Sequence, residues 1–288
     1  MREFARIQFR GDTAAFEAAW NSRYAPPIEL GIATLYKDQP EYQHMRQLFN
    51  AFAPDHEMTW HERVDAEYSD GELASFELLR LNIIGRAGAG DNAHATVYVE
   101  EPECSGCGRV AYRQVRSLVL DFSQVDVDPC EIGYFQHDLC ETDFDEFVVS
   151  TRVKALLEEQ QVRGVALRPV TPALTGRPAA GVTLPYYQLL VEPQIGPLVE
   201  PSPVERLDRC EVCGRYRQVL LGASGRTRES EFYFPRSSYA GDCIMRTTDP
   251  FGRLPRFGSK LIINQRMYRL LRENRITGYW VQPAHLVD

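Results

Sequence analysis

The sequence predicts an α+β protein in which one structural unit occurs twice. The first observation is the motif Cys-x-x-Cys-Gly, which occurs at 104–108 and again at 210–214, each time followed by Arg and a nearby Tyr-Arg-Gln-Val. The second is that residues 148–170 align without a gap with residues 262–284. The third is that strand-forming sequence follows both motifs. We therefore expect a cysteine turn, a helix and a short strand in each half.

Each motif places two thiolates three positions apart, where a tight turn can bring both to one metal ion. The glycine after the second cysteine can take the positive φ that folds the backbone beneath the sulfurs. We expect one structural Zn²⁺ ion shared by Cys104, Cys107, Cys210 and Cys213. Four thiolates complete a tetrahedral shell and leave no position for water or substrate, so this metal would hold the structure rather than react.

One shared site is the economical arrangement, because two separate sites would need further ligands. The first half could supply His137 and Cys140, whereas the second offers only Cys243 and the distant His285. A shared ion would also close a loop of about 100 residues, and a cross-link restricts the unfolded chain most when the loop is long. The duplicated units would then be arranged around a single zinc.

Composition and charge limit the possible functions. Hydrophobic residues make up 44% and charged residues 25% of the 288 residues, as in ordinary globular proteins, and no window is apolar enough for a membrane helix. The seven cysteines are an odd number, which suits a reducing compartment, so we expect a cytoplasmic protein. The net charge of -8 argues against a broad nucleic-acid surface and favours a basic partner. Three cysteines have no expected role: Cys130, Cys140 and Cys243.

Four segments are expected along the chain. Residues 1–94 form an N-terminal α+β segment, 95–172 the first repeat, 173–205 a proline-rich connector and 206–288 the second repeat. Apolar spacing in the N-terminal segment predicts a strand at 4–9, a helix at 13–24 capped by Asp12, a helix at 40–52, a strand at 73–84 and a turn at 86–92. Strands are also expected at 95–99, 110–122 and, within the connector, 186–191.

The aligned segments predict two matching helices. Ser150 and Asn264 are candidate N-caps, and Gly164 and Gly278 are candidate C-terminal caps. The apolar stripes have helical spacing and comprise Val149, Val153, Leu156 and Leu157 in the first helix and Ile263, Met267, Leu270 and Leu271 in the second. A strand follows each helix, at 165–167 and 279–281, and each is expected to stop at its proline, Pro169 or Pro283.

An acidic stretch precedes the first of these helices. It contains no basic residue and comprises Asp138, Glu141, Asp143, Asp145 and Glu146. Such charges are typical of a solvated surface or of favourable electrostatics ahead of a helix N-terminus. The same residues could instead form a docking patch for a basic partner, and they are our candidate partner-binding residues.

Catalytic motifs are not convincing. His56 and His61 are five positions apart, about 140° around a helix, so they could not bind one metal from one helix. Residues 222–225 lack the spacing of a nucleophile elbow, and residues 85–90 do not match a dinucleotide-binding fingerprint. We therefore expect a protein without enzymatic activity, although a site assembled from residues without a motif is a further hypothesis.

The chain resembles the double-CXXCG motif proteins, a family that includes immunity proteins paired with bacterial contact-delivered toxins. The resemblance rests on the two motifs, on Phe-Tyr-Phe-Pro-Arg-Ser at 232–237 and on the closing helix and strand at 262–283, and it covers roughly residues 95 to 288. It implies a cytoplasmic protein that binds and neutralises a cognate toxin without enzymatic activity. An acidic patch would suit a toxin that is a basic nuclease.

A zinc-ribbon module that binds nucleic acid is the alternative from another class. Its basic residues would have to cluster beside the two motifs, and the candidates are Arg109, Arg113, Arg116, Arg209, Arg215 and Arg217.

Overall fold

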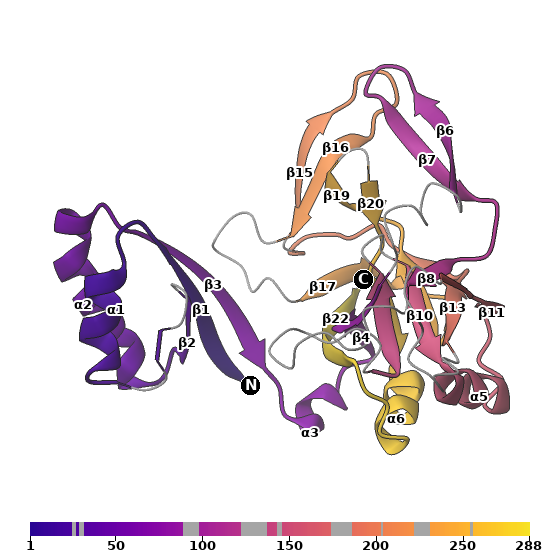
Figure 1. Cartoon of the computed structure of the whole chain (residues 1–288). Coiled ribbons are helices and arrows are strands. Elements are labelled where there is room, and N and C mark those ends of the chain that lie inside the picture. Colours follow the sequence, from indigo (N-terminus) through magenta and orange to yellow (C-terminus); the bar gives the residue numbers. More distant parts are fainter. Residues whose placement is uncertain are drawn as a thin grey trace.

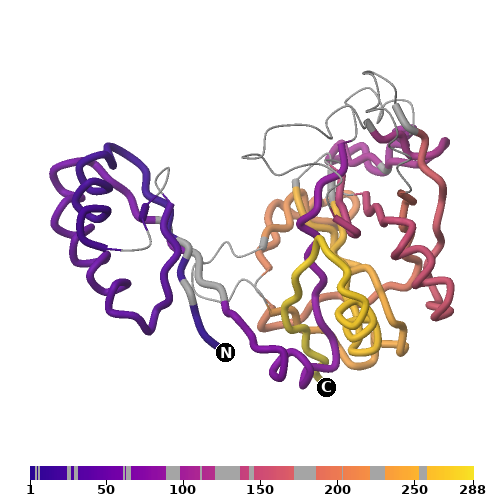
Figure 2. Tube along the Cα trace, turned by 60° about the horizontal axis from the view of Figure 1, so that its bottom comes forward, coloured from indigo at the N-terminus to yellow at the C-terminus, as the bar shows by residue number. Residues whose placement is uncertain are grey.

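The computed structural model describes residues 1–24, 27–28, 32–88, 98–121, 137–142, 146–173, 186–202, 204–221, 231–253 and 256–288. Within these ranges the protein has a mixed α+β fold made mostly of strands, with five α-helices. The expected fold class is therefore confirmed at this level. An N-terminal unit stands beside a larger body in two different views (Figures 1 and 2).

The N-terminal unit is a three-stranded antiparallel sheet with two helices on one face (Figure 1). Its elements are β1 (Arg2–Arg10), α1 (Ala14–Asn21), β2 (Ile32–Tyr36), α2 (Pro40–His56) and β3 (Thr59–Glu67), and the strand order is β2-β1-β3. Alternate residues of β1 and β2 pack beneath the helices together with aromatic side chains. The most buried members are Ala5, Ile7, Phe16, Trp20, Leu35 and Met45.

The strand at 4–9 and the two helices expected here are confirmed, with two corrections. The expected cap Asp12 is wrong, because the cap position is Thr13, whose hydroxyl donates to Glu17 Oε1 at 2.7 Å. The second helix runs on to His56 and contains Pro54. Glu57 then ends it with a φ of +49°.

The single strand expected at 73–84 is wrong at its start. Ser69 begins a short helix, α3 (Asp70–Leu73), because its side chain accepts the Glu72 N–H while the Glu72 carboxylate accepts the Ser69 N–H. The strand itself is β4 (Leu78–Ile83). The turn expected at 86–92 is also wrong where it is described, since β5 (Gly85–Ala87) is a strand.

Two hairpins carry the cysteine motifs at their tips. The first pairs β6 (Tyr98–Cys104) with β7 (Arg109–Gln114), and the second pairs β15 (Val204–Arg209) with β16 (Tyr216–Leu221). The chain thus returns antiparallel after each motif, as expected, and most of the strand expected at 95–99 lies outside the described residues. The second hairpin continues through β19 (Phe251–Arg253) and β20 (Arg256–Gly258), and β8 (Val119–Asp121) pairs with β12 (Thr171–Ala173).

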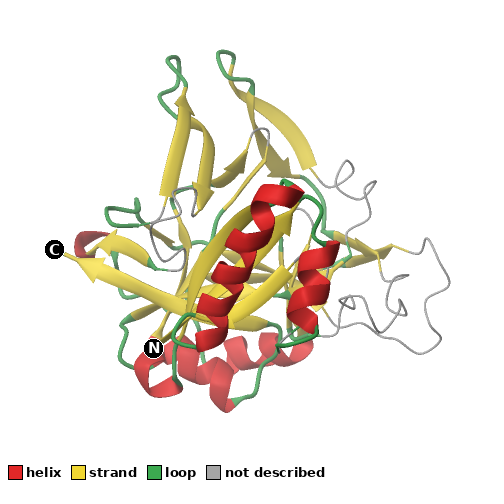
Figure 3. Ribbon diagram, turned by 90° about the vertical axis from the view of Figure 1, so that its left-hand side faces the viewer, coloured by secondary structure: helices red, strands yellow, loops and turns green. Residues whose placement is uncertain are grey.

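Two mixed sheets form the body (Figure 3). The five-stranded sheet has the order β11-β13-β10-β9-β5 and contains β9 (Leu139–Thr142), β10 (Phe147–Ser150), β11 (Val165–Pro169) and β13 (Tyr186–Val191). The six-stranded sheet has the order β14-β18-β21-β4-β22-β17 and contains β14 (Gln194–Ile195), β17 (Phe232–Pro235), β18 (Ile244–Thr247), β21 (Leu261–Asn264) and β22 (Tyr279–Val287). Helices α5 (Thr151–Glu159) and α6 (Gln265–Glu273) follow β10 and β21. A short 3₁₀ turn, η1 (Arg236–Ser238), follows β17.

The two sheets share an order of four strands, β11-β13-β10-β9 and β22-β4-β21-β18. The registers also correspond, since Val149 faces Tyr187 in one sheet and Ile263 faces Leu79 in the other. Each sheet takes one central strand from outside its own repeat. Strand β4 precedes the first motif but lies between β21 and β22, while β13 follows the first helix-strand unit and lies between β10 and β11.

The connector expected at 173–205 is therefore part of the body. Its predicted strand is confirmed as β13 and is central in the five-stranded sheet, and β14 adds an edge to the six-stranded sheet. One core cluster joins the two sheets and both helices, and it includes Leu79, Val149, Leu157, Ile263 and Leu271. Strands β4 and β5, which belong to the expected segment 1–94, pair with strands of the body.

The N-caps of both helices are confirmed. The Ser150 side chain accepts the Val153 N–H, and the Asn264 side chain accepts the Met267 N–H. The expected C-terminal caps Gly164 and Gly278 are wrong, because the residues that leave the helices with positive φ are Gln161 at +48° and Arg275 at +49°. The two glycines lie further along, directly before the strands β11 and β22.

The strand ends differ between the halves. Strand β11 ends at Pro169 as expected, but β22 continues through Pro283 to Val287, so that prediction is wrong. Strand β17 pairs with β22 only from Ala284 onward, and at Pro283 the pairing partner is Leu79 of β4. A proline that lacks an N–H is tolerated there because the second ladder begins one residue later.

Candidate metal centre

The two cysteine turns have the same local geometry. In the first, the Gly108 N–H donates to Cys104 O at 3.0 Å, and in the second the Gly214 N–H donates to Cys210 O at 2.8 Å. The glycines have φ values of +70° and +71°. This is the positive φ that the sequence predicted, and it folds each backbone back beneath its pair of sulfurs.

The four motif sulfurs lie together. Cys104 Sγ is 3.8 Å from Cys210 Sγ, Cys107 Sγ is 3.8 Å from Cys213 Sγ, and all four lie within 4.8 Å of one another. A tetrahedral ion with metal–sulfur bonds of about 2.3 Å would require edges of about 3.8 Å. The separations are far too long for a disulfide of about 2.0 Å. The donor set therefore fits a tetrahedral metal ion that joins segments 106 residues apart.

The described residues contain no second group of this kind. Cys140 is buried in β9, where its thiol contacts His137 O at 3.4 Å, and burial raises its pKa to about 12. A buried protonated thiol is a poor metal ligand. Cys243 is partly buried and lies outside the cluster, while Cys130 is outside the described residues.

Backbone N–H groups prepare one thiol of each hairpin for metal binding. The N–H groups of Cys213 and Val212 lower the pKa of Cys210 to about 6. The N–H of Cys107, together with that of Gly106, lowers the pKa of Cys104. Burial raises the pKa of Cys107 to about 11. Metal ions bind thiolates, so the lowered pKa of Cys210 and of Cys104 favours the form that a metal ion would bind.

Polar contacts also tie the hairpins together beside the sulfurs. Glu103 accepts Arg109 Nε at 2.7 Å from its own hairpin and Arg215 Nη1 at 2.8 Å from the other. Arg217 Nη2 donates to Gly106 O at 3.2 Å across the same junction. A hollow of about 250 Å³ lies here and is lined by Glu103, Cys104, Arg109, Cys213 and Arg215.

Glycine at position 106 allows the two turns to approach closely. A Cβ atom there would lie 2.4 Å from Val212 Cγ2 and 3.5 Å from Cys210 Sγ. The first distance is far below van der Waals contact, so any side chain would push the second turn away. Gly106 is the residue between the cysteines that the motif pattern alone did not single out.

The acidic stretch does not form one exposed group among the described residues. Asp138 accepts Ser150 Oγ at 2.8 Å and Thr277 Oγ1 at 3.2 Å, so it connects the start of α5 to the approach to β22. Glu146 accepts Gln188 Nε2 at 2.7 Å and the Tyr98 hydroxyl. Glu141 is partly buried in β9. Asp143 and Asp145 lie outside the described residues, and the partner-binding role of the five stays a prediction.

The histidine pair that was considered as a catalytic motif lies outside the group of four cysteines. His56 ends α2 and His61 lies in β3, so the two histidines do not share a helix. Residues 222–225 and 89–90 are outside the described residues. Among the described residues no helix has the length and apolarity needed to cross a lipid bilayer.

The sequence did not predict a cluster of polar side chains around the buried carboxylate of Glu231. Glu231 accepts the hydroxyls of Tyr68 and Tyr233, the latter at 2.9 Å, and lies 3.2 Å from His285 Nε2. The contact with His285, and after it the two tyrosine hydroxyls, lower the pKa of Glu231 to about 2 although burial acts in the opposite direction. The His285 ring stacks on Tyr233 with centroids 4.4 Å apart. The residues of this cluster come from three distant segments of the chain, so no local sequence pattern indicated the cluster.

Neither a scan against protein-family models nor a search of curated proteins found a match to this chain.

Proposed function

We propose that this protein is a non-enzymatic immunity protein that binds and neutralises a cognate bacterial toxin in the cytoplasm, and that one structural Zn²⁺ ion holds its two cysteine hairpins together. The observation that carries the proposal is the cluster of four sulfurs with separations of 3.8 Å. Four thiolates fill the coordination shell of zinc, so the ion would have no position for substrate.

The duplicated architecture is part of this proposal. The matching turns, the matching N-caps and the shared strand order support two copies of one unit, each with a zinc knuckle and a helix-strand element. The sulfur pairs Cys104–Cys210 and Cys107–Cys213 join equivalent positions of the two motifs. A single ion between the copies is what an approximate two-fold arrangement favours.

The toxin-binding role rests on the resemblance to double-CXXCG motif proteins and on charge. A net charge of -8 favours association with a basic protein, and a nuclease with a cationic phosphate site is such a protein. The acidic stretch at 138–146 is one candidate contact, through Glu141 and the residues that follow it.

Nucleic-acid binding through the hairpins is the weaker alternative. Arg109 and Arg215 pair with Glu103, and Arg113 pairs with Glu101 at 2.5 Å. These carboxylates offset the positive charge that phosphate binding would need. A gel shift that weakens steeply with salt would favour this alternative over the proposal.

Metal content tests the first part of the proposal. We expect one zinc ion per chain by elemental analysis and native mass spectrometry, and a tetrahedral thiolate spectrum after replacement of zinc with Co²⁺. Cys210→Ser should lose the metal, whereas the matched control Cys243→Ser should keep it. A wild-type protein that purifies without metal and binds neither ion would contradict the metal centre.

Co-expression tests the second part. We expect the product of the adjacent gene to inhibit growth, and this chain to restore growth and to co-purify with that product. Charge reversal of Glu141 should weaken the complex and its salt dependence if the acidic stretch contacts the toxin. Rescue of growth without a complex would argue against direct neutralisation.

A further inference from the structure

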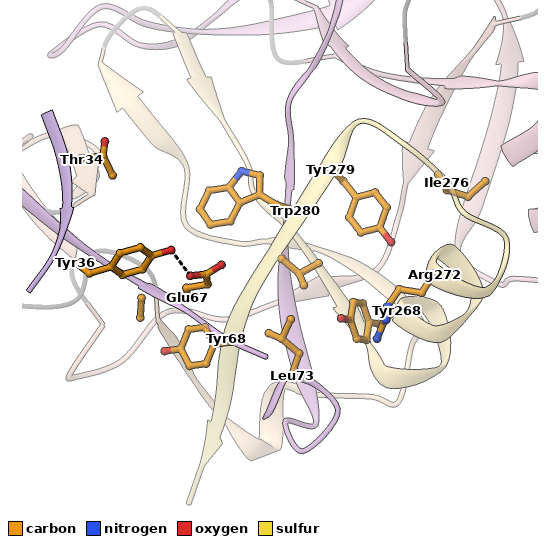
Figure 4. A pocket seen from close by; sticks show the side chains of 12 residues that line it. Thr34, Tyr36, Glu67, Tyr68, Leu73, Tyr268, Arg272, Ile276, Tyr279 and Trp280 are labelled. Atoms are coloured by element: carbon orange, nitrogen blue, oxygen red, sulfur yellow. Dashed lines mark hydrogen bonds between the residues drawn. The ribbon is translucent and has the colours of Figure 1, made fainter. Parts of the chain in front are cut away.

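A groove separates the N-terminal unit from the body. It has a volume of about 630 Å³, and its walls come from β2, the end of β3, α6 and β22 (Figure 4). Thr34 and Tyr36 lie on one wall, and Tyr279 and Trp280 lie on the other (Figure 4). A volume of this size is typical of a site that accommodates a small ligand or a few side chains of a partner.

The groove exposes aromatic side chains, and Trp280 is the most informative of them. Its exposed fraction is 41%, and within the described part of the chain no ring or cation stacks on it. Tryptophan is usually well buried and is enriched where proteins contact partners. Trp280 therefore offers a large apolar face with no internal occupant among the described residues.

One guanidinium and one carboxylate line the groove, and their surroundings differ. Arg272 Nη2 pairs with Asp70 Oδ2 at 2.6 Å, so its charge is offset. Glu67 accepts the Tyr36 hydroxyl at 2.7 Å, and no basic side chain of the described residues forms an ion pair with it. The bond to Glu67 raises the pKa of Tyr36, so the tyrosine stays a neutral donor. Among the described residues, Glu67 is thus the carboxylate of the groove that forms no ion pair.

Two aromatic rings of the groove already contact arginine side chains of the protein itself. The guanidinium carbon of Arg2 lies 3.7 Å from the centre of the Tyr36 ring, and that of Arg272 lies 5.6 Å from the Tyr268 ring. Both are cation–π contacts made by arginine. A guanidinium that entered from outside would find an aromatic face at Trp280 and a carboxylate at Glu67.

We propose that this groove is the docking site for an extended segment of the partner protein, and that one arginine of this segment stacks on Trp280 and pairs with Glu67. This inference rests on the proposed function for the identity of the partner, but the recognition chemistry is independent of it. Charge complementarity favours a cationic segment, because an acidic segment would be repelled by the carboxylate of Glu67.

A pair of peptides tests the recognition chemistry without the partner. One capped pentapeptide has a central arginine between leucines, and the other has citrulline, which is neutral and of similar shape, in the same place. We expect the wild-type protein to bind the arginine peptide at least about fivefold more tightly than the citrulline peptide, because citrulline forms neither the ion pair nor the cation–π contact. Calorimetry at low salt measures both affinities. Equal affinities, or no binding of either peptide, would overturn the proposal.

Three variants locate the site. Glu67→Gln should remove the preference for arginine while keeping weak binding of both peptides, and Trp280→Ala should weaken binding of both. Ile84→Ala is the matched control, because Ile84 is an exposed apolar residue at 50% that does not line the groove. Circular dichroism melts establish that all variants fold. Arginine preference that survives in Glu67→Gln would contradict the assignment.

The same variants separate this inference from the proposed function. If the toxin binds wild type and Trp280→Ala equally well, the groove is not its docking site, while the immunity role stands. If the arginine peptide binds and the toxin does not, the groove stands and the immunity role fails. A doubled mass in sedimentation that Trp280→Ala abolishes would identify a second copy of the chain as the occupant and overturn the proposal.

Discussion

The N-terminal unit and the cysteine hairpins are held together by different physical means. The N-terminal unit buries Ile7, Phe16, Trp20 and Met45 completely. In the β6–β7 hairpin, the residues of β6 before Cys104 are exposed or only partly buried, and Val99 has an exposed fraction of 44%. The first region has an apolar core of its own, whereas the described residues of β6 bury no apolar side chain ahead of Cys104.

This difference indicates where a metal ion would stabilise the fold. An isolated two-stranded hairpin is marginally stable in water because it has no face to bury. A structural zinc ion in a small peptide contributes on the order of 10 kcal/mol, which exceeds what the ion pairs through Glu103 would supply. The metal would thus take the place of a hydrophobic core at the hairpin tips.

Removal of the metal is the strongest way to test this comparison. We expect a chelator, or the double substitution Cys104→Ser and Cys210→Ser, to separate the hairpins and expose 98–121 and 204–221 to protease. The N-terminal unit should stay protected, since its core contains no ligand. Limited proteolysis with mass spectrometry measures both regions. Equal loss of protection in the N-terminal unit would show that the two regions are not independent.

Trp20→Ala tests the other side of the comparison. Trp20 is fully buried and stacks on Tyr24 with centroids 4.4 Å apart. Its truncation should lower the free energy of unfolding of the N-terminal unit by about 3–5 kcal/mol, because a cavity remains where the indole was. Chemical denaturation measures the loss. Zinc content should not change, and a variant that also loses its metal would contradict the separation.

Acid should weaken the contact between the end of the N-terminal unit and the body. Tyr68 directly follows β3 and donates to Glu231 in the body. The pKa of Glu231 is lowered to about 2 from an ordinary value of 4.5, so the carboxylate stabilises the fold above pH 4.5 and this contribution is lost as the pH falls from 4.5 toward 2. At about 1.4 kcal/mol per pKa unit, the loss amounts to a few kcal/mol.

Glu231→Gln is the variant that checks this pH dependence. It should be less stable than wild type at neutral pH, and the difference should shrink as the pH is lowered from 4.5 toward 2. Thermal melts across that range measure it. A constant difference between the two proteins would show that Glu231 does not titrate as described.

The smallest expected effects compare the two helices within the body. Ser150→Ala and Asn264→Ala each remove one side-chain acceptor from the first turn of a helix. Each should cost about 1 kcal/mol. Urea denaturation resolves losses of this size. Similar values would sharpen the correspondence of the two halves, and a neutral effect at one position with a large loss at the other would contradict it.

Features with local causes could be predicted from the sequence. The cysteine spacing and the following glycine determine the turn, so the sequence pointed to the four sulfurs that the fold brings together. Ser150 and Asn264 were found because an N-cap acts on residues only three positions away. The helix ends were missed, since Gln161 and Arg275 adopt positive φ without the glycine that usually indicates it.

Long-range features could not be predicted in the same way. The Glu231 cluster unites Tyr68, Tyr233 and His285, and nothing in the sequence near any one of them points to the others. The groove has the same character, because Glu67 and Trp280 belong to different parts of the chain. Pairing between distant segments depends on tertiary packing, for which a single sequence carries no periodic signal.

The central position of β4 has a consequence for biosynthesis. Leu78 and Leu79 are fully buried between β21 and β22, which the ribosome makes nearly two hundred residues later, or roughly 10–40 s at about 5–20 residues per second. During that interval this apolar strand lacks its native pairing partners, β21 and β22. We expect nascent or truncated chains that lack β22 to need chaperone protection and to aggregate, even when the N-terminal unit has already folded.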